Sequence, residues 1–202
     1  MRSSRFFAVL LVAVALAVLF VVRFRTSTSP PPSGGTATLI GDSLNVGVEP
    51  YLPGALRHWR VVANDRVGRS TPEGIVELEA GRPALSPYLV VSLGTNDPPG
   101  AVDGFRADVA RVLKLAGPNR CVVWATIWRD GAPNDGFNGV LRDVAEASPR
   151  VRLVDWAGMV EQHPEWLAPD GLHGNAAGYR ERAGAIAEAV RSCVPGQTLT
   201  ER

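Results

Sequence analysis

Residues 88–97 read Tyr-Leu-Val-Val-Ser-Leu-Gly-Thr-Asn-Asp, a short apolar run that ends abruptly in small and polar residues. Runs that are apolar at consecutive positions are typical of strands buried on both faces of a parallel sheet. Four other runs share this character. The chain therefore predicts five strands, at residues 38–40, 59–63, 88–93, 121–126 and 151–155.

Helical patterns separate these runs. Residues 102–116, 137–147 and 176–194 place apolar side chains at helical spacing. Thr71-Pro72 predicts the start of another helix, ending near Ala80, because a capping residue precedes a proline at the first helical position. Between residues 44 and 56, two prolines predict a short or kinked helix. Strand–helix alternation predicts one layered α/β domain with a parallel sheet.

Length and charge narrow the class of protein. The chain has 202 residues and a formal net charge of +1, which suits one domain and argues against a nucleic-acid partner. We expect a monomeric catalytic body over residues 36–195, large enough to bury one core, and a frayed tail over 196–202.

The N-terminus carries an unbroken apolar run from Phe6 to Val22, flanked by arginines. This run reaches the lower limit for a membrane-spanning helix and is longer than a typical signal-peptide core. We expect residues 1–25 to be a membrane signal anchor, with a cleaved signal peptide as the alternative. Residues 26–35 are rich in Pro, Gly and Ser and predict a solvated linker. The body is then membrane-anchored outside the cytoplasm, or secreted.

Two cysteines occur, Cys121 at the start of a predicted strand and Cys193 at the end of the last predicted helix. In an exported protein they can form a disulfide that fastens this helix to the sheet. The alternative is a pair of buried free thiols. Two cysteines and three histidines without ligand spacing do not predict a zinc site.

Polar residues follow the predicted strands. Ser43 comes after the first, Gly68 after the second and Asn96 after the third, while Asp170 and His173 lie between the fifth strand and the last helix. Because the carboxyl ends of parallel strands share one edge, these residues are expected to meet there. A serine hydroxyl needs a base to take its proton and a carboxylate to orient that base. The set predicts cleavage or transfer of acyl groups.

Four blocks in this order resemble the SGNH hydrolase family, also called GDSL esterases and lipases. They are Gly41-Asp42-Ser43-Leu44, Gly68, Gly94-Thr95-Asn96-Asp97 and Asp170-Gly171-Leu172-His173. The resemblance spans about residues 36–194. It implies a three-layer α/β/α sandwich of flavodoxin-like type around a five-stranded parallel sheet.

The resemblance also implies roles. Ser43 is the expected nucleophile, His173 the base and Asp170 the residue that orients it. The backbone N–H groups of Ser43 and Gly68 and the side-chain amide of Asn96 form the expected oxyanion hole. No metal or organic cofactor is implied. Asp42 is expected to support the nucleophile loop and not to react.

These residues predict an extracytoplasmic serine ester hydrolase that acts through an acyl-enzyme on a small acyl ester, a lipid or an acylated glycan. The alternative with the same site is an O-acetyltransferase or deacetylase of cell-wall glycans. A third reading is an inactive glycan-binding domain. Trp128, Trp156 and Trp166 either line a substrate cleft or pack in the core.

Overall fold

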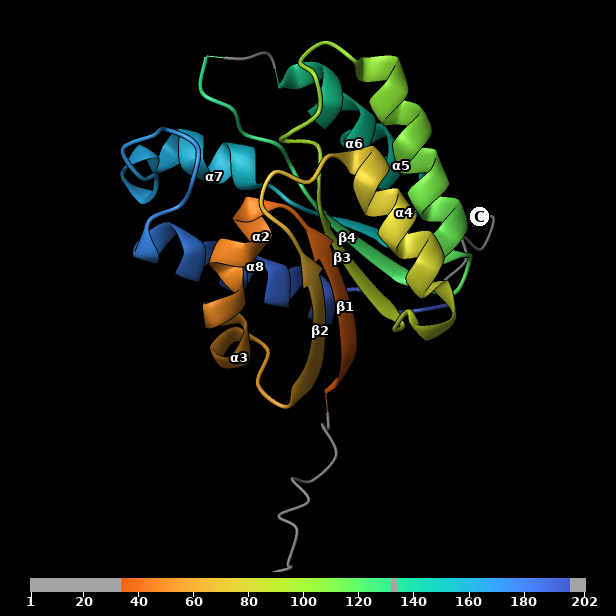
Figure 1. The fold of residues 1–202 in the computed structure, drawn as a ribbon. Helices are drawn as coiled ribbons and strands as arrows, with labels where there is room; N and C mark the ends of the chain where they lie inside the picture. Colours follow the sequence, from red (N-terminus) through yellow and green to blue (C-terminus); the bar gives the residue numbers. More distant parts are fainter. Residues whose placement is uncertain (1–33, 132–133, 197–202) are drawn as a thin grey trace, which may run out of the picture. The chain divides into compact units, whose positions relative to one another are not determined.

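The computed structural model describes residues 34–131 and 134–196 (Figure 1). Five parallel strands form one sheet in the order β2-β1-β3-β4-β5. The strands are β1 (Gly35–Gly41), β2 (Trp59–Asp65), β3 (Tyr88–Ser92), β4 (Cys121–Ala125) and β5 (Val151–Val154). All five predicted strands are confirmed. The expected anchor and most of the expected linker and tail lie outside the described residues, and β1 starts at the last residue of the expected linker.

Helices connect the strands. The predicted kinked segment after β1 is divided into α2 (Ser43–Val48), a 3₁₀ turn that contains Pro50 and α3 (Leu52–Ala55). The other helices are α4 (Thr71–Gly81), α5 (Val102–Ala116), α6 (Asp135–Ala147), α7 (Trp156–Gln162) and α8 (Ala176–Ser192). Helix α7 was not predicted from the sequence. Within 34–131 and 134–196, no helix combines the length and apolar character needed to cross a membrane.

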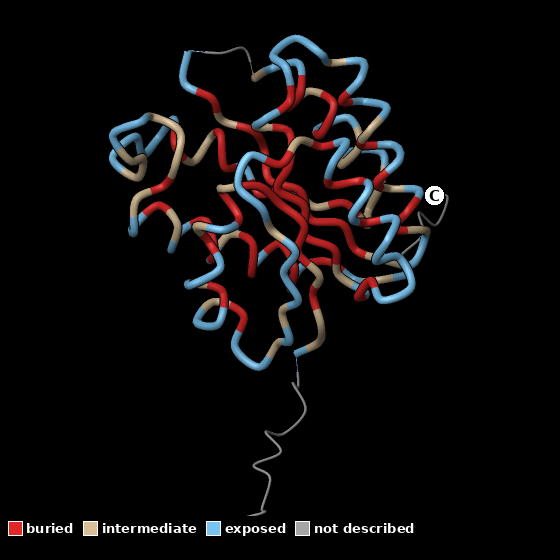
Figure 2. Tube along the Cα trace, in the orientation of Figure 1, coloured by how far each residue is buried: buried red, intermediate tan, exposed pale blue. Residues whose placement is uncertain are grey.

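The sheet is the middle of three layers. Helices α4, α5 and α6 cover one face and pack Ile75, Phe105 and Phe137 against it. Helices α2, α3 and α8 contribute to the other face, where Ile186 and Val190 lie in the core. Consecutive residues of a strand therefore pack into the two cores on opposite faces of the sheet. Figure 2 shows the central strands buried between the layers, and the predicted three-layer α/β/α sandwich is confirmed.

Strand β2 differs from the other predicted strands. Its consecutive apolar residues predicted burial on both faces, but β2 forms the edge of the sheet and Val62 is 44% exposed. That part of the prediction is wrong, because apolarity along a strand does not reveal whether a further strand or helix covers it.

Cys121 and Cys193 form a disulfide. Both residues are buried, and the bond joins the start of β4 to the residue that follows α8. Cys121 lies at the amino edge of the sheet, the edge opposite the loops that carry the candidate site.

Candidate active site

The strand register brings the predicted site residues to one edge. Gly41, the last residue of β1, pairs with Asp65 at the end of β2 and with Ser92 at the end of β3. Ser43, Gly68 and Asn96 follow these three ends within a few residues. The shared edge predicted from the sequence is therefore present.

Ser43 is the first residue of α2, directly after a tight strand-to-helix turn. A side chain at Gly41 would place its Cβ 2.5 Å from the Cβ of Asn45, so this turn requires glycine for close approach. Asp42 caps the helix: its Oδ1 accepts the Leu44 N–H at 2.9 Å. The Ser43 N–H lies in the first turn, where backbone donors have no intrahelical acceptor.

Ser43, His173 and Asp170 form a continuous hydrogen-bonded chain. The Ser43 Oγ lies 2.9 Å from His173 Nε2, and His173 Nδ1 lies 2.7 Å from Asp170 Oδ2. The loop that bears His173 and Asp170 is closed at its base by a bridge between Leu167 and Gly174. A nucleophile, a base and an orienting carboxylate in contact is the arrangement that activates a serine.

Asp170 is held as an anion by hydrogen bonds. Its Oδ1 accepts the backbone N–H groups of Leu172 and His173, each at 3.0 Å. Together with the side-chain bond to His173, which has the largest effect, these bonds lower the pKa of Asp170 to about 2. The carboxylate stays charged across the neutral range although its side chain is 52% exposed.

The side-chain amide of Asn96 connects its loop to Asp42, in the turn that carries Ser43. Its Nδ2 donates to Asp42 Oδ2 at 3.2 Å and to the Arg69 carbonyl at 3.1 Å. Both amide hydrogens thus face protein acceptors. Both bonds, at 3.2 and 3.1 Å, are at the long end of the normal range.

Gly68 lies in the exposed turn after β2, with φ of 74°, a backbone conformation that favours glycine. The Arg69 carbonyl that accepts the Asn96 amide belongs to the next residue. Within the described part of the chain, no acceptor contacts the Gly68 N–H. Gly68 and Asn96 therefore belong to adjoining loops at the same edge.

Sequence reasoning missed Arg182, a fully buried arginine on α8. Its Nη2 donates to Ser92 Oγ at 2.8 Å, and its guanidinium lies 4.8 Å from the Trp156 ring centroid. Arg182 shares a helix face with Ile186 and Val190, four and eight residues on, which belong to the apolar core. The helical spacing of Arg182 relative to these apolar residues was the sequence signal that could have identified it as a buried charge.

Burial is the main influence on the pKa values of Asp42, Arg182 and Asp65. It is the main cause that raises the pKa of Asp42, with the Leu44 N–H and the Arg182 charge acting in the opposite direction. Desolvation likewise lowers the pKa of Arg182 to about 10, against the favourable effect of Asp42. Asp65 accepts from Asn45 of α2 at 3.1 Å, and burial raises its pKa to about 7.

The three tryptophans take different positions. Trp156 is buried and does not line an open cleft. Trp166 is half-buried and stacks on His163, with 4.1 Å between ring centroids. Trp128 is half-buried, and its indole N–H donates to the Gly171 carbonyl at 3.0 Å, inside the loop that carries Asp170 and His173. Of the three, Trp128 contacts the candidate site.

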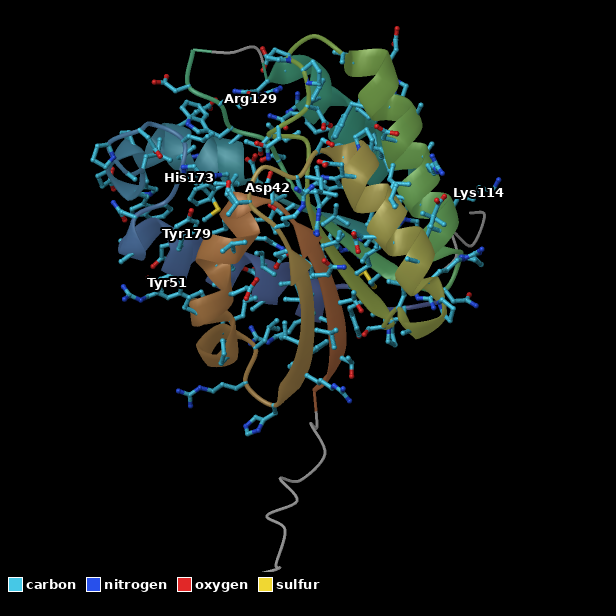
Figure 3. All side chains as sticks on the ribbon, in the orientation of Figure 1. Asp42, Tyr51, Lys114, Arg129, His173 and Tyr179 are labelled. Atoms are coloured by element: carbon cyan, nitrogen blue, oxygen red, sulfur yellow. A yellow bond between two sulfur atoms is a disulfide. The ribbon has the colours of Figure 1, made fainter. Side chains whose placement is uncertain are left out.

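In the described ranges, no three His, Cys, Asp or Glu side chains gather in a way that would hold a metal ion. Figure 3 labels His173, Asp42 and Tyr179 of α8 in the part of the molecule around the start of α2. The arrangement can take a proton from Ser43 through His173, and Asp170 can stabilise the resulting imidazolium.

Known proteins resemble this chain in sequence and in fold. No family model matches the chain. Over 157 residues it is 28% identical to the peptidoglycan O-acetyltransferase OatA of Listeria monocytogenes, a match that covers 75% of this chain and 24% of OatA. The chain thus spans about a quarter of the length of this curated relative.

Solved structures resemble the fold more fully. The OatA C-terminal catalytic domain of Streptococcus pneumoniae, with a methylsulfonyl adduct, aligns with a TM-score of 0.62 at 19% identity, covering 79% of this chain and 91% of that domain. A lipase/acylhydrolase from Enterococcus faecalis aligns with a TM-score of 0.64 at 20% identity, covering 81% and 100%. A lipolytic G-D-S-L protein from Veillonella parvula gives 0.64 at 16% identity, covering 76% and 96%. The chain therefore has the SGNH, or GDSL, hydrolase fold.

Proposed function

We propose that this protein is a serine ester hydrolase that works through an acyl-enzyme formed on Ser43. The observation that carries the proposal is the unbroken chain from Ser43 Oγ through His173 to Asp170, with contacts of 2.9 and 2.7 Å. A serine that merely caps a helix does not need a histidine with its own carboxylate partner. The similarity of the fold to a lipase/acylhydrolase points the same way.

In the proposed reaction, Ser43 Oγ attacks the ester carbonyl carbon while His173 Nε2 takes the hydroxyl proton. The carbonyl π electrons move to oxygen and form an oxyanion. When the tetrahedral intermediate collapses, the alcohol leaves with the proton from His173, and the acyl group stays on Ser43. A water molecule, deprotonated by His173, then releases the acid and restores Ser43.

The oxyanion is assigned to the N–H groups of Ser43 and Gly68 and the Asn96 amide. The free Gly68 N–H and the first-turn Ser43 N–H support this assignment, since neither has a competing acceptor in the described residues. When the oxyanion forms, the Asn96 amide gives up its hydrogen bond to the Arg69 carbonyl and donates to the oxyanion instead, because a charged acceptor forms the stronger bond. Loss of one such donor costs on the order of a hundredfold to a thousandfold in rate.

A second candidate function is transfer or removal of acetyl groups on a glycan with the same site. Its support is the similarity to a peptidoglycan O-acetyltransferase, found both by sequence and by structure. Both reactions begin with acylation of Ser43. In transfer a sugar hydroxyl replaces water in the second half-reaction, whereas in removal the sugar leaves in the first half-reaction and water completes the second. An acylated glycan is then the substrate or the product.

We also propose that the body acts outside the cytoplasm, held to a membrane by residues 1–25 or released by their cleavage. The disulfide between Cys121 and Cys193 supports the compartment, because such bonds persist in oxidising environments. Membrane fractionation of cells, with the N-terminal mass of the recovered protein, distinguishes an anchor from a cleaved signal peptide.

The main test is turnover of aryl esters of increasing acyl length by the wild type and by Ser43→Ala. We expect the substitution to remove turnover and to leave the circular dichroism spectrum and Tm unchanged. Full activity in the Ser43→Ala protein would refute the proposed nucleophile. Adding an oligosaccharide and measuring acylated sugar by mass spectrometry separates transfer from hydrolysis.

A phosphonate probe addresses the third reading, an inactive glycan-binding domain. We expect one probe adduct on Ser43 in the wild type and none in His173→Ala, since the base activates the hydroxyl. A wild-type protein that forms no adduct would favour a binding domain.

A further inference from the structure

Arg182 carries a full charge into the interior of the domain. The residue is 1% exposed, and only its Nη2 has a hydrogen-bond partner among the described residues, the hydroxyl of Ser92. Placing an unpaired guanidinium in a core is costly unless another charge compensates it. Ser92 connects this arginine to Asp42: the Asp42 N–H donates to the Ser92 carbonyl at 3.1 Å, Arg182 donates to the Ser92 hydroxyl, and Asp42 is itself completely buried. The negative charge of Asp42 favours the ionised guanidinium of Arg182, and the positive charge of Arg182 favours the ionised carboxylate.

Asp42 connects this buried charge to the proposed machinery. One carboxylate oxygen accepts the Leu44 N–H and caps the helix that begins with Ser43. The other oxygen accepts the Asn96 amide, a proposed oxyanion donor. A carboxylate accepts on both oxygens, whereas a protonated carboxyl has to give up acceptor capacity to its own O–H. The charge state of Asp42 therefore governs both contacts.

We propose that Arg182 is a positioning residue for the proposed hydrolase: its buried charge keeps Asp42 ionised, and ionised Asp42 holds the Asn96 amide and the first turn of α2 in place around Ser43. This inference rests on the proposed function for its effect on turnover. Arg182 touches no reacting atom; it acts through Asp42.

Several other groups surround Asp42 and bear on its titration. From α8, Tyr179 also faces Asp42 and Arg182. From the loop after β2, the Arg69 guanidinium donates to the Gly41 carbonyl. From the loop after β3 come the uncharged side chains of Thr95 and Asn96. Among these neighbours, Arg182 is the cation that acts on the Asp42 carboxylate, and its removal shifts the balance toward protonated Asp42.

The activity test compares Arg182→Met with Arg182→Lys and with Arg180→Met. Arg180 is an exposed arginine two residues earlier on the same helix and serves as the matched control. We expect Arg182→Met to lower kcat/KM for an aryl ester by roughly 10- to 100-fold at neutral pH, the scale of a small misplacement at an active site. We also expect the acid limb of its kcat/KM-against-pH profile to move to higher pH. Arg182→Lys, which keeps the positive charge, should recover most of the lost kcat/KM and most of the shift in the pH profile.

A double-mutant cycle tests whether Arg182 acts through Asp42. In the Asp42→Asn background there is no carboxylate left to keep ionised, so Arg182→Met should change kcat/KM by less than about threefold there. An equally large loss in both backgrounds would overturn the proposal, because Arg182 would then act without Asp42. Asp65, whose pKa is raised to about 7 by burial, is present in every variant and so does not affect the comparison.

A readout that does not need activity keeps this inference separate from the proposed function. In folded Ser43→Ala protein, ¹³C NMR of the Asp42 carboxyl should show its titration moving to higher pH when Arg182 becomes Met. An unchanged titration would refute the role of Arg182, whatever the enzyme does. If Arg182→Met fails to fold, Arg182→Gln removes the charge while keeping an amide donor for Ser92, and the same comparison applies.

Discussion

Asp42 and Asp170 lie on either side of Ser43 in opposite environments. Asp42 is completely buried, and burial raises its pKa; Asp170 is half-exposed, and hydrogen bonds lower its pKa to about 2. Asp42 is embedded between the first turn of α2 and the Asn96 loop, whereas Asp170 belongs to a surface loop that holds His173. Exposure alone thus does not indicate which carboxylate takes part in the chemistry. The exposed one contacts His173, the proposed base, and the buried one caps α2 and accepts the Asn96 amide.

The largest effect should come from Asp170→Asn. The amide presents the wrong partner to His173 Nδ1 and so favours the wrong tautomer, and kcat should fall on the order of 10⁴-fold. Tm should fall moderately, because the amide oxygen still accepts the Leu172 and His173 N–H groups but without the negative charge that strengthens these bonds. Steady-state kinetics and thermal unfolding measure both.

Asp130→Asn is the control for this change. Asp130 is an exposed aspartate next to Gly171, and its substitution should leave kcat within about twofold of the wild type. A loss of kcat below tenfold in Asp170→Asn would remove Asp170 from the proposed triad.

Asp42→Ala should show the reverse balance, with a large loss of stability. It leaves the Leu44 N–H uncapped and the buried Arg182 without its compensating charge, so the free energy of unfolding should fall by about 2 kcal/mol. Asp42→Asn, which keeps an oxygen for the cap, should lose less. Denaturant titration measures both variants, and equal stability of Asp42→Ala and wild type would show that the carboxylate is not structural.

The pH dependence of stability should carry opposite signs for the two residues. Asp170 has a lowered pKa in the folded state, so its stabilisation is complete above its unfolded value of 3.8 and is lost as the pH falls toward about 2. Asp42 has a raised pKa, so its carboxylate opposes folding above that pKa and the penalty is relieved as the pH falls. Asp65 contributes with the same sign as Asp42.

Unfolding curves between pH 2 and 7 test these signs. Compared with the wild type, Asp170→Asn should lose the rise in stability between about pH 2 and 4. Asp42→Asn should lose a decline in stability with increasing pH. The same slope change in both variants would contradict the assignment of burial to one residue and hydrogen bonding to the other.

The smallest effect should come from Trp128→Phe. The change removes the indole N–H that donates to the Gly171 carbonyl and keeps an aromatic ring, so about 1 kcal/mol of support for the Asp170 loop is lost. We expect a severalfold decrease in kcat. Trp166→Phe, in which the stacking on His163 is retained, should not lower kcat, and an equal decrease in both would show that the Gly171 bond is unimportant.

The sequence predicted the architecture well because the strands are short, apolar and central. Residues 89–92 and 121–125 are buried from both sides, so their composition reports their environment directly. The same reasoning failed for β2, whose apolar residues lie at the sheet edge. Helix α7 was missed because its seven residues are too short for a clear helical period.

Much of the candidate site was also predictable, because strand ends and loop motifs are local features. Ser43 and the Asp170–His173 pair could be named from the sequence, and the contact between them follows from the parallel topology. Tertiary structure alone decided that Arg182 is fully buried and donates to Ser92, and that Asn96 donates to Asp42 and Arg69. Burial and hydrogen bonding depend on residues distant in the chain, and they set the charge states that composition cannot reveal.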